Sequence, residues 1–286
     1  MEMMATASRR VVESSFLRKH EFALSLVDCM PSSFLDRLLF QPAAICLQLQ
    51  KAVQRLLGGP SSVLVQFKEG PLRDELFECF TSEKYFILGT SFEHATQAHL
   101  KEIVKPGDIV YDVGAHAGYM ALLLSTFCGP RGHVFAFEPS PVNFNRLRRN
   151  MELNRICNAT VLNLAASDNE GSATLIEMGS YSCLLSKDRC RGENYSEVKT
   201  IRLDDFVFRD GRPAPRFLKI DIEGHAVQCL MGTMALLQET RPIVFCEIHH
   251  NEEFKGVREV FDVCSYTMTQ MDSVRKFPKR FIATPR

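Results

Sequence analysis

Ionisable side chains follow directly after two short apolar stretches in the second half of the chain. Asp221 lies near the end of the stretch 217–222 and Glu223 follows it, and His249 follows the stretch Ile243–Ile248. Carboxylates and imidazoles are common proton acceptors in enzymes. Ligands of open α/β sheets bind beyond the carboxyl ends of the strands. We therefore expect Asp221, Glu223 and His249 to lie together and to face a substrate that loses a proton.

Each of these residues also has a structural interpretation. Lys219 and Asp221 alternate with apolar residues and could simply form a buried ion pair. Glu223 could cap the helix that follows, because a helix N-terminus favours a carboxylate. His249 could be a loop histidine bonded to backbone, although its unperturbed pKa of about 6.5 suits a general base.

A divalent metal is a further alternative at the same strand ends. Asp221, Glu247, His249 and His250 carry the oxygen and nitrogen atoms that such an ion would need. A bound metal would make an acceptor hydroxyl easier to deprotonate. Nothing in the spacing demands an ion, so the sequence assigns no metal ligand.

A turn containing two glycines follows the apolar stretch Ile109–Val113. Gly114 and Gly118 let the backbone approach a ligand closely. A dinucleotide-binding turn of the type G-x-G-x-x-G would carry glycine where His116 and Tyr119 stand. His116 would also crowd a pyrophosphate at the helix N-terminus. The turn therefore favours a ligand without a pyrophosphate, such as an adenosyl amino acid.

Two carboxylates further along the chain suit the rest of an adenosyl ligand. Glu138 ends the next apolar stretch, about 20 residues after Gly118, where a carboxylate can accept hydrogen bonds from both ribose hydroxyls. Its alternative role is that of a helix-capping residue before Pro139. Asp168 follows the third stretch and could reach the adenine amino group, or it could be an ordinary turn residue.

The elements that must position these residues alternate between strand and helix, which is typical of a parallel, doubly wound sheet. We predict an α/β, Rossmann-like, mostly parallel sheet with an antiparallel edge strand at the C-terminus, over residues 281–284. Hairpins or loops are expected over 172–203. The expected strands span 109–113, 133–137, 159–164, 217–222 and 243–248, and the expected helices span 92–104, 119–127, 141–153 and 224–237.

The chain divides into two parts with different sequence patterns. Residues 1–60 are expected to form a helical N-terminal extension that ends at Gly58-Gly59-Pro60, and residues 61–286 form the main domain. The apolar helix faces of the extension need a partner. That partner is the main domain in the default interpretation, a second copy of the chain in a homo-oligomer, or a membrane surface.

Composition narrows the class of partner and the compartment. Lys plus Arg and Asp plus Glu both number 34, so no broad basic surface for nucleic acid is expected. The 10 cysteines include no CxxC pair, which disfavours a structural zinc site and indicates a reducing compartment. The chain has no apolar run long enough for a transmembrane segment. A cytoplasmic location is expected, with an organellar transit peptide as the alternative.

The residues discussed above lie in four sequence motifs. The motifs are D-V-G-A-H-A-G-Y from Asp112, A-F-E-P from Ala136, A-A-S-D from Ala165 and L-K-I-D-I-E-G from Leu218. In this order they resemble the motifs of the FkbM-type methyltransferase family, a branch of the Rossmann-like enzymes that use S-adenosylmethionine. The resemblance runs from about Tyr85 to the C-terminus and implies O-methylation of a hydroxyl on a sugar, polyketide or other small molecule. His116 stands where the family typically has asparagine.

These observations combine into one hypothesis with two alternatives. The alternatives are an NAD-dependent oxidoreductase and a non-catalytic module that binds an adenosyl ligand. In the hypothesis, S-adenosylmethionine lies along the first three strand ends and a small-molecule hydroxyl acceptor faces Asp221, Glu223 and His249. The residues assigned to the donor are Asp112, Gly114, Ala115, His116 and Gly118 for its amino-acid end, Glu138 for its ribose and Asp168 for its adenine.

Overall fold

The computed structural model describes residues 62–80, 83, 94–178, 181–185, 195–271 and 274–286. All of them belong to the unit Ser62–Arg286. The helical extension predicted for residues 1–60, and any oligomer contact that it would make, lie outside the described residues.

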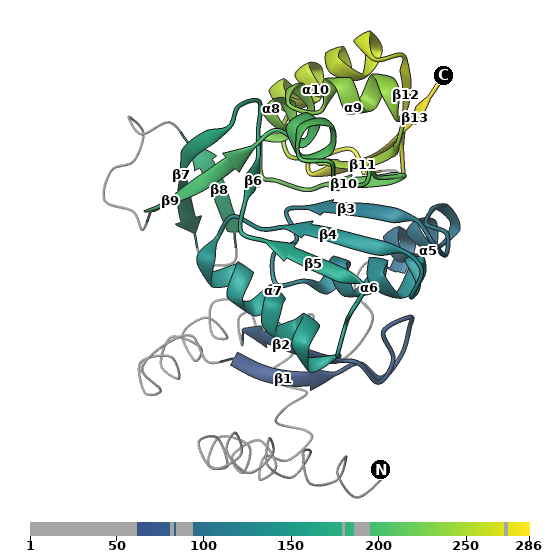
Figure 1. The fold of residues 1–286 in the computed structure, drawn as a ribbon, viewed down its shortest axis with the longest axis vertical. Helices are drawn as coiled ribbons and strands as arrows, with labels where there is room; N and C mark the ends of the chain where they lie inside the picture. The colour runs from purple at the N-terminus through teal and green to yellow at the C-terminus, as the bar shows by residue number, and fades with distance from the viewer. Residues whose placement is uncertain (1–61, 81–82, 84–93, 179–180, 186–194, 272–273) are drawn as a thin grey trace, which may run out of the picture. The chain divides into compact units, whose positions relative to one another are not determined.

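The centre of this unit is a seven-stranded sheet of order β12-β13-β11-β10-β3-β4-β5 (Figure 1). Five strands are parallel, and β13 and β12 add to one side in antiparallel pairing. The order reverses at β3, so the site expected of such a sheet lies beyond the ends of β3 and β10. The predicted mostly parallel Rossmann-like sheet is confirmed. Its strands are β3 (Ile109–Val113), β4 (His133–Phe137), β5 (Ala159–Leu162), β10 (Phe217–Ile220), β11 (Ile243–Ile248), β12 (Tyr266–Gln270) and β13 (Lys279–Pro285).

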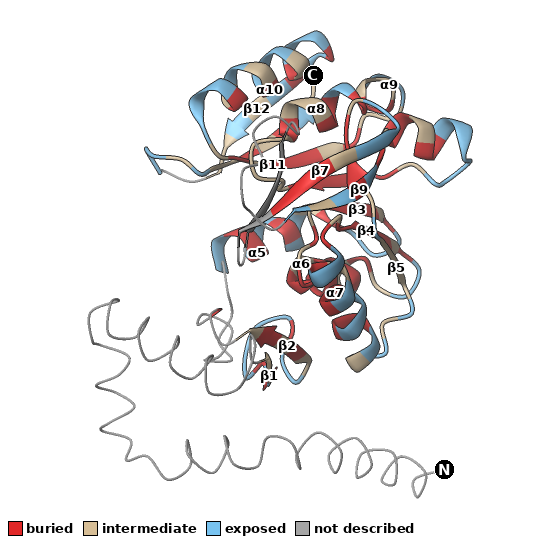
Figure 2. Ribbon diagram, turned by 90° about the vertical axis from the view of Figure 1, so that its left-hand side faces the viewer, coloured by how far each residue is buried: buried red, intermediate tan, exposed pale blue. Residues whose placement is uncertain are grey.

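Helices cover both faces of the sheet (Figure 1). Successive side chains of β3 point to opposite faces, so Val110 packs in one core while Tyr111 and Val113 pack in the other. The strand interiors are buried while the outward surface of α10 is exposed (Figure 2). None of the described helices is long and apolar enough to cross a bilayer. The helices on one face are α5 (His94–Ile103), α6 (Tyr119–Cys128) and α7 (Pro141–Leu153). The helices on the other face are α8 (Ala226–Met231), α9 (Met234–Glu239) and α10 (Asn251–Val263).

Two smaller sheets complete the described part of the chain. A four-stranded sheet of order β6-β9-β7-β8 is inserted between β5 and β10, followed by the short π-helix η2. It contains the hairpin predicted within residues 172–203. The antiparallel pair β1–β2 packs on α7, where Asn150 and Asn154 bond the backbone of β2. The elements are β6 (Ala165–Ala166), β7 (Gly171–Met178), β8 (Tyr181–Leu185), β9 (Tyr195–Ile201), η2 (Asp205–Arg209), β1 (Ser62–Gln66) and β2 (Leu76–Phe80).

The structure corrects two predictions. The C-terminal strand β13 is antiparallel, as predicted, but it is not the edge strand, because β12 pairs with its outer side. The helix predicted over 224–237 is two helices, α8 and α9, interrupted at Gly232. A Cβ at Gly232 would lie 1.9 Å from the carbonyl oxygen of Ser167, so this close backbone approach requires glycine and breaks the helix.

Candidate active site

The turn after β3 is held against the end of β4 by backbone hydrogen bonds. The N–H groups of Gly114 and Ala115 both donate to the carbonyl of Phe137, at 3.0 Å each. Gly114 and Gly118 have positive φ angles of 79° and 95°, and His116 has one of 50°. The turn is therefore a fixed backbone shape at the switch in strand order, where an α/β sheet binds its ligand.

Glu138 lies between this turn and the start of α7. Its Oε2 accepts the N–H of His116 and its Oε1 accepts the N–H of Ser140, both at 2.8 Å. Burial raises the pKa of Glu138 to about 7, although these two N–H donors act in the opposite direction. The residue that caps α7 is Ser140, whose Oγ accepts the N–H of Asn143. Glu138 is thus free of the capping role and holds the turn in place.

Asp112, which the sequence hypothesis assigns to the donor, is completely buried and paired with a lysine. Its side chain is 0 % exposed and lies 3.0 Å from the Nζ of Lys219, which also donates to the carbonyl of Gly114 at 3.3 Å. Burial alone would lower the pKa of Lys219, but the carboxylates of Asp112 and Asp221 raise it. The ion pair suspected for Lys219 exists, and its nearer carboxylate is Asp112 rather than Asp221 at 3.7 Å.

Asp168 lies beyond β6 and is half-buried. Its Oδ1 accepts hydrogen bonds from Asn169 at 2.8 Å and from Ser167 at 3.2 Å. The Oγ of Ser167 lies 3.0 Å from the Nε2 of His225, which precedes α8. Ser167 and His225, which the sequence hypothesis did not include, join the third strand end to the loop after β10.

His249 lies between two of the predicted acceptor-side carboxylates. Its Nε2 is 3.5 Å from the Oδ1 of Asp221, and its Nδ1 is 3.1 Å from the Oε2 of Glu223. Burial alone would lower the pKa of His249, but Asp221 and Glu223 raise it to about 8. Glu223 does not cap α8: the residue at the N-cap is His225, and its side chain makes no capping hydrogen bond. The structure therefore brings Asp221, Glu223 and His249 together, as predicted.

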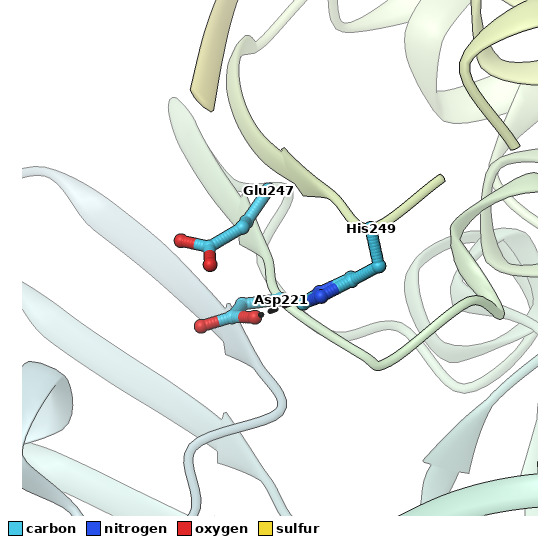
Figure 3. A group of neighbouring side chains, drawn as sticks. All are labelled: Asp221, Glu247 and His249. Atoms are coloured by element: carbon cyan, nitrogen blue, oxygen red, sulfur yellow. Dashed lines mark ion pairs between the residues drawn. The ribbon is translucent and has the colours of Figure 1, made fainter. Parts of the chain in front are cut away.

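Glu247 and Arg280 extend this acceptor-side group. Arg280 faces Glu247 across the β11–β13 ladder, with 2.8 Å between Nε and Oε2. The carboxyl groups of Asp221 and Glu247 lie side by side, and the ring of His249 points toward Asp221 (Figure 3). His250 instead caps α10, where its Nδ1 accepts the N–H of Glu253 at 3.2 Å. Arg280 was missed because its position depends on the register of β13.

Glu253 fixes both loops of the acceptor side and was also missed. Its side chain is buried, with Oε2 accepting the N–H of His249 at 2.7 Å and Oε1 accepting the N–H of Ala226 at 3.1 Å. It therefore bonds the backbone at the starts of both α8 and α10. The sequence signal was a Glu at the third position of α10, where a carboxylate can reach backbone N–H groups at the helix start.

A buried ion pair supports the other side of the turn after β3. Glu83 bonds Arg146 of α7, whose guanidinium lies 3.9 Å above the ring of Phe80. The Oε1 of Glu83 is 3.9 Å from the Nε2 of His116. Glu83 therefore connects the segment after β2 with the turn residue that replaces the expected asparagine. No short-range sequence pattern predicts this contact.

The turn after β3 and the loop after β10 touch one another. A Cβ built on Gly114 would lie only 1.9 Å from the carbonyl oxygen of Asp221. The N–H of Asp221 donates to the carbonyl of Val113 at 3.0 Å. A ligand held at the turn after β3 would thus lie next to the group formed by Asp221, Glu223 and His249.

Comparisons with known proteins agree on one family. A model described as "Methyltransferase FkbM domain" matches residues 112–277. Hexuronic acid methyltransferase AglP of Haloferax volcanii is 30% identical over 161 residues, covering 56% of this chain and 64% of that protein. The 31-O-demethyl-FK506 methyltransferase FkbM of Streptomyces tacrolimicus is 31% identical over 160 residues, covering 45% and 60%. The chain spans less than two thirds of the length of these curated relatives.

Solved structures of methyltransferases are also similar to this chain. Methyltransferase FkbM from Methylobacillus flagellatus KT has 17% identity and a TM-score of 0.46, covering 65% of this chain and 50% of that one. TYW2 of M. jannaschii in complex with AdoMet has 12% identity and a TM-score of 0.45, covering 79% and 85%.

Proposed function

Because the chain belongs to the FkbM methyltransferase family, we propose that it is an S-adenosylmethionine-dependent O-methyltransferase acting on a hydroxyl of a sugar or another small molecule. The observation that carries this proposal is the contact between the glycine turn after β3 and the group formed by Asp221, Glu223 and His249. A methyl donor and a hydroxyl acceptor bound at these two places would be neighbours, and alignment is most of what methyl transfer requires.

The residues of the turn fit the donor in the following roles. Gly114, Ala115, His116 and Gly118 offer backbone to its amino-acid end, and Glu138 offers carboxylate oxygens to its ribose. Asp112 acts through Lys219, because its side chain has no exposed surface. The assignment of Asp168 to the adenine follows from its place after β6, beyond the carboxyl end of β5.

The acceptor side supplies the proton chemistry. When bound, S-adenosylmethionine supplies a methyl group on a sulfonium, so that the sulfur–carbon bond breaks as the oxygen–carbon bond forms. The acceptor hydroxyl is oriented toward the turn after β3 by Asp221, Glu223 and His249. One of these three side chains accepts the proton of the hydroxyl. Glu253 keeps His249 in place through its backbone N–H.

The choice of acceptor follows from the relatives rather than from the site. One relative is named for a hexuronic acid and the other for a 31-O-demethylated compound. Both names fit a hydroxyl-bearing small molecule as the acceptor here. Family membership favours methyl transfer over NAD-dependent oxidation. A cytoplasmic location stays a prediction.

Calorimetry of the full chain with S-adenosylmethionine, S-adenosylhomocysteine and NAD tests the donor. We expect micromolar binding of both adenosyl ligands and none of NAD; binding of NAD alone would refute the proposal. His249→Ala should keep donor binding and lose methyl transfer to a uronic acid or sugar acceptor. His99→Ala is the matched control, because His99 is an exposed histidine of α5. Equal turnover by the two variants would remove His249 from the mechanism.

A further inference from the structure

Three potential metal ligands meet at the ends of β10 and β11. Asp221, Glu247 and His249 each offer one ligand atom, and these atoms lie within 4.8 Å of one another. Figure 3 shows the two carboxyl groups side by side, with the imidazole directed toward Asp221. Two carboxylate oxygens and one imidazole nitrogen form a ligand set for a divalent cation. Three protein ligands also leave coordination positions open, as in catalytic metal sites.

The environment of His249 supports a cation at this place. Its Nε2 is buried and lies 3.5 Å from an oxygen of Asp221, which is also a ligand atom of the proposed site. Its Nδ1 lies 3.1 Å from Glu223, a distance at which Nδ1–H can donate. With a metal bound in place of the Nε2 proton, the remaining ring proton would stay on Nδ1 and point at Glu223. Metal-bound histidines characteristically direct their second nitrogen at a carboxylate in this way.

The charges around the cluster also favour a cation. Asp221, Glu223 and Glu247 contribute three negative charges within a partly buried group. Arg280 offsets the charge of Glu247 at 2.8 Å. The Nζ of Lys219 lies 3.7 Å from Asp221 but is nearer, at 3.0 Å, to the buried carboxylate of Asp112. The protonated ring of His249 and the Arg280 guanidinium supply two positive charges against these three carboxylates, while Lys219 is shared with Asp112, so a cation bound in place of the ring proton would improve the charge balance.

We propose that Asp221, Glu247 and His249 bind one divalent metal ion, with Glu223 orienting the imidazole of His249. The inference deepens the proposed function, on which its catalytic meaning rests. An ion at this position would take the acceptor hydroxyl as a further ligand next to the donor turn. It would make that hydroxyl a stronger acid, and the proton would leave to solvent.

The test is direct metal binding by the full chain, independent of activity. After treatment with a chelator, the protein is titrated with Mn²⁺ and with Zn²⁺ by calorimetry, and Mn²⁺ is also followed by electron paramagnetic resonance. We expect one site per chain. Glu247→Gln and Asp221→Asn should each weaken it at least about tenfold, because each replaces a charged carboxylate ligand by a neutral amide. Thermal unfolding checks that both near-isosteric variants are folded.

The matched control is Glu252→Gln, which removes one exposed carboxylate beside His250 at the start of α10. It changes the net charge equally and should leave the affinity for metal unchanged. No binding of either ion, or equal binding by Glu247→Gln and Glu252→Gln, would overturn the metal site. So would displacement of Mn²⁺ by S-adenosylmethionine, because the donor's own positive charge would then occupy the place. S-adenosylmethionine titrated without metal reports on the proposed function separately.

Discussion

Replacing Gly114 by alanine tests whether the donor turn and the acceptor-side loop form one rigid unit. The φ angle of Gly114 is +79°, and an added Cβ would lie 1.9 Å from the carbonyl oxygen of Asp221. That oxygen cannot move freely, because the N–H of the same residue bonds the carbonyl of Val113. The substitution therefore has a backbone cost and a packing cost.

The two costs can be separated with a matched variant. Gly211 has a similar φ of +67°, is exposed, and has no atom within 4 Å of an added Cβ. A positive φ costs an L-residue about 1–2 kcal/mol, so Gly211→Ala should lower the free energy of unfolding by that amount. Gly114→Ala should lower the free energy of unfolding by roughly 1–3 kcal/mol more than Gly211→Ala does, which is the range for overpacking a tight site. Its turn must also shift by about 1.5 Å to restore ordinary contact.

Urea unfolding of both variants measures the free energies, and calorimetry measures the affinity for S-adenosylmethionine. Gly114→Ala should be the less stable variant and should bind the donor at least about tenfold more weakly, because a shift of this size misplaces the ligand. Gly211→Ala should bind the donor normally. If Gly114→Ala is as stable as Gly211→Ala and binds the donor equally well, the two loops are not in rigid contact and the reasoning fails.

Two further predictions concern the buried carboxylates of the donor side. The pKa of Glu138 is raised to about 7, so the carboxylate ionises above that pH, and S-adenosylmethionine should bind more tightly as the pH rises from about 6 to about 8. Calorimetry of Glu138→Gln should show no such rise, and a flat profile for the natural protein would contradict the ribose assignment. Lys219→Met leaves Asp112 buried without its cation and should lower the free energy of unfolding by about 3–5 kcal/mol. Asp112→Asn in the same chain should restore most of it, as measured in urea, and a loss below about 1 kcal/mol would show that the pair is dispensable.

The sequence predicts the part of the fold in which apolar runs are long and regular. The five parallel strands and their polar ends follow from buried, β-branched stretches bounded by turns. The break at Gly232 could not be predicted in the same way, because it depends on the backbone near Ser167, far away in the sequence. The edge strand β12 alternates threonine with larger residues and has no distinctive signal of its own.

Some residues of the candidate site could likewise be predicted from the local sequence, and others could not. Asp221, Glu223 and His249 were predictable because each lies within three residues of the end of a strand, and strand ends of a parallel sheet converge. Arg280 and Glu83 approach the site from elements whose pairing and packing are tertiary features. The burial of Asp112 was likewise hidden, because a motif shows which residue ends a strand but not whether its side chain reaches solvent.

The inserted sheet has a consequence for how such a protein can diversify. The described strands β6, β7, β8 and β9 pair only with one another, so this insert can lengthen, shorten or be exchanged without breaking a ladder of the central sheet. The turn after β3, the Lys219 pair and the Glu253 bonds would survive such an exchange intact. A lineage could therefore vary this insert while keeping these three features of the central sheet, and a chimaera that exchanges only β7, β8 and the connection between them would show whether they persist.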